Sequence, residues 1–179
     1  MKKAIPLLVA TILLLTSCSL GDTYMFGKIF RSDREIANES FEKIIRAIES
    51  RDKNALTNLF SERSIADSDD FDGSITALFD YYKGEMTSYN DWGGPNTNDG
   101  INDDGTGRNW KNIQSTYDVE TNGGIYRFAI KTFLKDSADA NNIGVYSLYV
   151  MRAEDSDIRF AYWGDGNWTP GINIDEAKE

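Results

Sequence analysis

Residues 109–134 read NWKNIQSTYDVETNGGIYRFAIKTFL, and this stretch decides the fold. Along 109–121 the even-numbered residues are polar except for Trp110, whereas Ile113, Tyr117 and Val119 lie at odd-numbered positions. This alternation places the two sets on opposite faces, as in a β-strand. Asn122-Gly123-Gly124 then supplies residues that tolerate positive φ, as a tight turn requires. The sequence therefore predicts an antiparallel hairpin whose second strand covers 125–134.

Helical periodicity precedes this hairpin. Ser32-Asp33-Arg34-Glu35 fits a capping box, and apolar residues at helical spacing follow as far as Ile48. Asp52 can cap a short second helix, and a third is expected over residues 71–82. Between these two, Ser61-Glu62-Arg63 interrupts the pattern, so three helices are predicted in all.

After Gly84, expected at the C-terminus of the third helix, the period changes to two. Residues 86–92 are predicted to form a strand, and the stretch 93–107, rich in Gly, Asn and Asp, is predicted to be a loop. Residues 143–151 are a further strand. Periodicity assigns no structure to 158–174, which is rich in aromatic residues and glycine.

Helices followed by antiparallel strands are typical of an α+β fold. A curved antiparallel sheet around the first helix would bury the apolar face of that helix. We expect one α+β domain over residues 32–179, preceded by a signal peptide (1–17) and by a lipidated cysteine with its tether (18–31).

The start of the chain carries a targeting signal. Lys2 and Lys3 precede an apolar run that ends in Leu15-Thr16-Ser17-Cys18. This run is about a dozen residues long, whereas a membrane span needs about 20. The last four residues resemble the lipobox of bacterial lipoproteins, which implies a lipid on Cys18 that tethers the protein to the outer face of the cell membrane. The alternative is an ordinary cleaved signal peptide.

Composition excludes several classes of function. The chain has no histidine, and Cys18 is its one cysteine, so Ser/His and Cys/His nucleophile arrangements are absent. Without Lys2 and Lys3, the 19 basic residues become 17 against 29 acidic ones, a net charge of −12. Such a charge argues against nucleic acid as a partner. We expect no cofactor, no metal and no enzymatic activity.

Several runs resemble a family of uncharacterised Gram-positive lipoproteins (domain of unknown function 5104). The resemblance also implies a nuclear transport factor 2-like fold, a cone in which N-terminal helices pack in a curved antiparallel sheet. It implies no activity. The runs that carry it are Leu78-Phe79-Asp80-Tyr81-Tyr82, Asp91-Trp92-Gly93-Gly94-Pro95, Val145-Tyr146-Ser147-Leu148, Phe160-Ala161-Tyr162-Trp163-Gly164-Asp165-Gly166 and Trp168-Thr169-Pro170-Gly171.

Aromatic residues beside acids and glycines are the candidate ligand-binding residues. Folds of the cone type often bind small molecules between sheet and helices, in pockets that are apolar with a few polar groups. Packing in a solid core is the alternative. The candidates are Trp92, Trp110, Tyr126, Trp163 and Trp168 as lining residues, with Asp91 and Asp165 at the mouth.

Two acidic features are weaker candidates. Asn96–Gly105 resembles a calcium loop superficially, but its spacing lacks the first ligand and the later glutamate, so a solvated loop is expected. Asp118 and Glu120 share a strand face, which points to the pocket or to solvent.

The leading functional hypothesis is therefore a tethered module that binds a small molecule. The alternatives are a module that binds an envelope protein through Trp163 and Trp168, and, ranked lowest, an enzyme that uses Asp and Tyr side chains.

Overall fold

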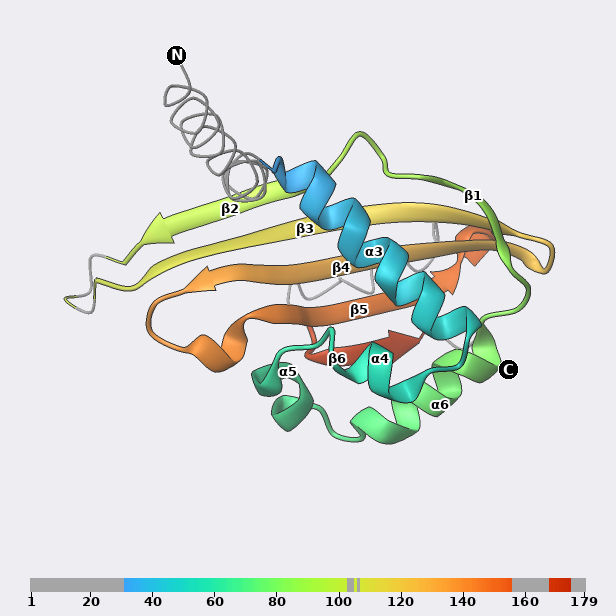
Figure 1. The fold of residues 1–179 in the computed structure, drawn as a ribbon, viewed down its shortest axis with the longest axis horizontal. Helices are drawn as coiled ribbons and strands as arrows, with labels where there is room; N and C mark the ends of the chain where they lie inside the picture. Colours follow the sequence, from blue (N-terminus) through green and yellow to red (C-terminus); the bar gives the residue numbers. More distant parts are fainter. Residues whose placement is uncertain (1–30, 103–104, 106, 156–167, 175–179) are drawn as a thin grey trace, which may run out of the picture. The chain divides into compact units, whose positions relative to one another are not determined.

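The computed structural model describes residues 31–102, 105, 107–155 and 168–174 (Figure 1). The predicted signal peptide, Cys18 and most of the tether lie outside these residues, as do Trp163 and Asp165. Asp33–Glu179 form one compact unit, to which the described helices and strands belong. None of the described helices is long and apolar enough to cross a membrane.

Helices come first in the described part of the chain, as predicted. The long amphipathic helix and the helices after Asp52 and Asp70 are confirmed, and a further short helix lies where the sequence pattern was read as a break. The four α-helices are α3 (Asp33–Glu49), α4 (Lys53–Thr57), α5 (Glu62–Asp67) and α6 (Phe71–Tyr81).

Side-chain caps explain where the short helices begin. The Asp52 carboxylate accepts a hydrogen bond from the Ala55 N–H at 2.9 Å, which starts α4. The Ser61 hydroxyl accepts one from the Ser64 N–H at 3.1 Å, so the apparent break at Ser61 is the N-cap of α5. Gly84 has φ of 87°, as expected for a left-handed residue, but it lies beyond the end of α6, in the turn toward the sheet.

A single sheet holds all the described strands. Its order is β1-β3-β4-β5-β6, and β2 pairs with β3 as well. The β3–β4 hairpin is the predicted one, with Thr121 paired to Gly124 across the turn. The strands are β1 (Met86–Asn90), β2 (Asn96–Ile101), β3 (Asn109–Thr121), β4 (Gly124–Asp136), β5 (Gly144–Arg152) and β6 (Gly171–Ile174).

Two expectations about the sheet were wrong. The sheet is mixed, because β6 runs parallel to β5, with Ser147 paired to Gly171. Residues 96–101, expected in a loop, form β2, which pairs with β3 from Asn96↔Gln114 to Ile101↔Asn109. The stretch has few apolar side chains, but backbone pairing does not require them, and β3 extends beyond β1 to offer it a partner.

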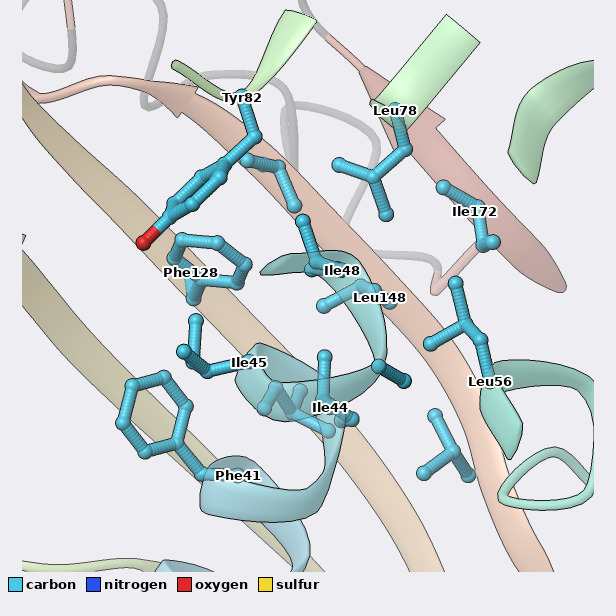
Figure 2. Close-up of a cluster of buried hydrophobic side chains, with 14 of the residues drawn as sticks. Phe41, Ile44, Ile45, Ile48, Leu56, Leu78, Tyr82, Phe128, Leu148 and Ile172 are labelled. Atoms are coloured by element: carbon cyan, nitrogen blue, oxygen red, sulfur yellow. The ribbon is translucent and has the colours of Figure 1, made fainter. Parts of the chain in front are cut away.

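The core lies between α3 and one face of the sheet. Figure 2 shows side chains of α3 together with Phe128 of β4 and Leu148 of β5. Phe41 stacks on Tyr117 of β3, with ring centroids 3.9 Å apart and planes at 9°. Aromatic and aliphatic side chains thus occupy the space in which the sequence predicted a ligand pocket.

We predict that Phe41→Ala lowers the free energy of unfolding by about 3–5 kcal/mol, because it removes a fully buried ring and leaves a cavity. Denaturant unfolding of the full chain measures the change. Ile125→Ala is the matched control, since Ile125 is exposed and should shift stability by about 0.5 kcal/mol or less. Equal effects of the two changes would contradict the position of Phe41 in the core.

Candidate functional site

The sheet has a second face, which points away from α3 and which we call the outer face. In β4, Tyr126, Phe128 and Ile130 belong to the core, so the odd-numbered residues that alternate with them, from Arg127 to Lys131, lie on the outer face. That face therefore carries a cation at Arg127 and another at Lys131.

Of the predicted site residues, Tyr126 lies in the core. Its side chain has no exposed surface. Its hydroxyl donates to the Tyr81 carbonyl oxygen at 3.2 Å and accepts from the Lys83 N–H at 2.9 Å. Tyr126 thus fastens the end of α6 to the sheet, and it offers no surface to a ligand.

Trp92 and Asp91 lie in the turn after β1, where an ion pair holds Asp91 and a cation–π contact holds Trp92. Arg34 donates two hydrogen bonds to Asp91, at 2.6 and 2.8 Å, and these lower the pKa of that carboxyl group. Trp92 has φ of 49° and lies over the Arg127 guanidinium, 4.3 Å from its ring centroid. Its indole N–H donates to Asp118 at 2.9 Å.

Trp110 and Trp168 lie elsewhere. The indole N–H of Trp110 donates to Asn102 at 3.2 Å, beside β2. Trp168 packs edge-on against Tyr149, with centroids 5.8 Å apart. The described candidates therefore do not converge on one pocket, and Trp163 and Asp165 fall outside the described residues.

The acids on β3 have structural partners. Asp118 receives two hydrogen bonds from Arg127, at 2.7 and 3.0 Å, and Glu120 accepts one from the Ser88 hydroxyl at 2.8 Å. No group of three or more acidic or sulfur side chains in the described ranges is placed to hold a metal ion.

A groove opens beside the outer face, between α5, the strands β4 and β5, and the turn that joins these strands. Its volume is about 610 Å³. Of the sequence candidates only Trp168 borders it. We call it the outer groove, and it is lined by Arg63, Asp67, Arg108, Lys131, Phe133, Ala138, Asp139, Asn142, Tyr146 and Trp168.

Lys131 is the unusual side chain of the outer groove. Its ammonium nitrogen lies 5.5 Å from the Phe133 ring centroid and 5.6 Å from that of Tyr146. Burial lowers the pKa of Lys131, since the charged form is partly removed from water. Within the described ranges, no carboxylate lies within 4.0 Å of its ammonium group.

The strand register explains why Lys131 has no counter-ion among the described residues. Arg127, four residues earlier on the same face, is paired across the ladder with Asp118. Lys131 is paired with Gln114 on β3 and with Ser147 on β5, and both are neutral. Of these two cations on one strand face, Arg127 has a carboxylate partner, whereas the described neighbours of Lys131 are neutral residues and two aromatic rings that attract its charge.

The other charges of the outer groove are paired. Arg63 donates to Asp67 at 2.6 Å and lies 4.0 Å from Asp139. Arg108 forms two hydrogen bonds with the buried Asp136, one of them at 2.8 Å, and these hold the pKa of that carboxyl group far below its usual range.

Asn142 donates to Asp136 at 3.0 Å, which fixes the turn that forms this wall. Its own buried carbonyl oxygen has no hydrogen-bond partner among the described atoms. Such an oxygen normally finds a donor.

A β-bulge places Tyr146 in the outer groove. Lys131 pairs with Ser147, but the next residue, Thr132, pairs with Val145, so Tyr146 is an extra residue in β5. Val145 and Leu148 both belong to the core. The extra residue allows the Tyr146 ring to lie beside Lys131.

The comparison with known families concerns most of these residues. The family described as "Domain of unknown function (DUF5104)" matches residues 43–153, which is more than half of the chain. The chain belongs to this family. No curated protein matches the chain. The DUF5104 region includes every lining residue of the outer groove except Trp168, and its description carries no activity.

Replacing Lys131 should stabilise the fold. We predict that Lys131→Met raises the free energy of unfolding at pH 7 by about 0.5–1 kcal/mol, because it removes a partly buried charge that has no counter-ion in the described part of the chain. The folded pKa of Lys131 is lowered, so the wild-type chain gains stability as pH rises toward the ordinary lysine value of about 10.4. The difference in the free energy of unfolding between Lys131→Met and the wild-type chain should therefore shrink as pH rises from the lowered pKa of Lys131 to the ordinary lysine pKa.

Denaturant unfolding of both chains at several pH values measures this difference. Lys135→Met, which changes an exposed lysine on the same strand, is the control and should leave stability nearly unchanged. A destabilised Lys131→Met variant would show that Lys131 supports the fold.

Proposed function

We propose that this protein is a non-catalytic module that binds a small organic molecule in the outer groove. The observation that carries the proposal is Lys131, a partly buried cation that lies beside two aromatic rings and has no counter-ion among the described residues. The outer groove combines the aromatic rings of Phe133, Tyr146 and Trp168 with charged and polar side chains, and its volume of about 610 Å³ suits a small organic molecule.

Binding fits the chemistry of the groove better than catalysis. A nucleophilic lysine or tyrosine needs a base or an acid within hydrogen-bond reach. In the described part of the chain, the Lys131 ammonium group has no such partner, and Arg63 engages both Asp67 and Asp139. The absence of histidine from the sequence supports the same choice.

We further propose that the domain is a nuclear transport factor 2-like cone that has its ligand site outside the cone. The order of elements supports the cone, since the helices precede the strands and α3 packs against one face of the sheet (Figure 1). The aromatic core supports the outer location, because fully buried Phe41, Tyr117 and Tyr126 occupy the inner side.

We predict that a survey of small molecules against the full chain, purified in detergent, yields ligands that raise its melting temperature. A ligand at about 100 times its Kd stabilises by about 2.7 kcal/mol, which thermal unfolding detects. Tyr146→Ala should weaken binding of the same compounds, since it removes one wall of the outer groove.

Trp92→Ala is the matched control, because Trp92 is an exposed aromatic residue that does not line the outer groove. Loss of binding in this variant with retention in Tyr146→Ala would place the site at Trp92 instead. A survey without ligands would overturn the proposed function.

We propose that the module works at the outer face of the cell membrane, held by lipid on Cys18. The run Leu15-Thr16-Ser17-Cys18 after an apolar segment supports this location. Two acyl chains anchor a protein stably, whereas a single chain holds it only marginally.

We therefore predict that Cys18→Ser moves the protein from the membrane fraction to the soluble fraction or stops its processing. Labelling with radioactive palmitate should mark the wild-type chain and leave the variant unmarked. Palmitate incorporation that persists in Cys18→Ser would contradict the lipid anchor.

A further inference from the structure

The charges around the outer groove restrict what it can bind. Arg63 is shared by Asp67 and Asp139, and Arg108 faces Asp136, so each of these carboxylates has a guanidinium group within 4.0 Å. Among the described residues that line the groove, Lys131 is the cation without a carboxylate within 4.0 Å. A ligand carboxylate beside Lys131 would give this ammonium group the close counter-ion that the described residues do not place within 4.0 Å of it.

A cationic ligand fits the outer groove poorly. Aromatic rings attract cations, but Lys131 already lies against the Phe133 and Tyr146 rings. The acids that a second cation would need, Asp67 and Asp139, face Arg63.

A dianion such as a phosphate monoester also fits poorly. One ammonium group neutralises one charge, and a second negative charge would stay uncompensated in a groove that Asp67 and Asp139 also line. Phosphate recognition generally uses a guanidinium fork or a row of backbone N–H groups.

The apolar part of the ligand has its own surface. Phe133 and Tyr146 meet edge to face beside Lys131, with centroids 5.7 Å apart, and Trp168 borders the same groove. These rings form an apolar wall against which a flat molecule can lie.

Resting on the proposed function, we infer that the ligand is an organic monocarboxylate with a flat apolar body. Its carboxylate pairs with the Lys131 ammonium group, and its body packs against Phe133, Tyr146 and Trp168. The ligand carboxylate offsets the free-energy cost of partly burying the charged Lys131 ammonium group, and this gain contributes to the affinity of the ligand.

Four naphthyl probes test the charge of the ligand on the full chain in detergent: naphthoate, neutral naphthamide, cationic naphthylmethylamine and dianionic naphthyl phosphate. Calorimetry gives their Kd values. Naphthoate should bind about tenfold more tightly than naphthamide, which is the effect of a partly buried ion pair, and the other two should bind more weakly than naphthoate.

Lys131→Gln should abolish the preference for naphthoate over naphthamide and leave the Kd of naphthamide within about twofold. Lys131→Arg should restore part of the preference, because it restores the charge. Lys135→Gln, at the exposed lysine of the same strand, should change neither value.

The pH dependence of naphthoate affinity distinguishes a ligand-binding role of Lys131 from a purely structural one. Naphthoate affinity should fall as pH rises through the lowered pKa of Lys131, while naphthamide affinity stays constant. Other charged or titratable groups also face the outer groove, namely Arg63, Asp67, Arg108, Asp139 and Tyr146. Lys131→Gln retains all of them, so a pH dependence that disappears in this variant belongs to Lys131.

Equal Kd values for naphthoate and naphthamide on the wild-type chain would overturn the inference, even if Lys131→Gln fails to fold. Stronger binding of the phosphate or of the amine would overturn it as well. In either case the proposed function stands, because a ligand still binds. Failure of all four probes, when other compounds of the survey bind, refutes the monocarboxylate alone, whereas failure of every compound refutes the proposed function.

Discussion

The stacking of the apolar face of α3 on the sheet is the constraint on which the rest of this molecule depends. Phe41 lies flat on Tyr117, and Ile44, Ile45 and Ile48 continue the contact toward β4 and β5 (Figure 2). With no disulfide available to a chain with one cysteine, this packing has to supply most of the stability. Because the inner side is filled, we propose a binding site on the outer face of the sheet.

On that outer face, cross-strand pairing separates structural charges from the one that we assign to function. Arg127 has its carboxylate directly opposite, at Asp118, and Trp92 lies over the pair. Lys131 has Gln114 and Ser147 opposite. A partly buried charge without a partner lowers stability, and proteins commonly accept such losses at functional sites.

Local patterns predicted the local parts of the fold. The hairpin at 122–124 and the periodicity of α3 were sufficient to place these elements, since turn chemistry and helical spacing act over a few residues. By contrast, β2 depends on the free edge of β3, and α5 depends on one serine cap in a stretch without a clear period. The parallel pairing of β6 is a property of the whole sheet.

The candidate site could not be predicted from local patterns, because its distinguishing feature is that the described neighbours of Lys131 include no counter-ion. Nothing near Lys131 in the sequence marks it as unpaired, and Lys135 on the same strand is an ordinary exposed lysine. Only the register, which places Gln114 and Ser147 beside it, shows the difference. The sequence analysis predicted that the large tryptophan side chains line a pocket, but of the described tryptophans only Trp168 borders the outer groove.

The bulge at Tyr146 has a consequence for how this site could be gained or lost. In a strand without the extra residue, the position before Ser147 would face the core, so the tyrosine ring would be turned toward α3. The number of residues between Gly144 and Leu148, more than their identity, thus decides whether the groove has its second aromatic wall. Insertion or deletion of a single codon would therefore add or remove one aromatic wall of the proposed site.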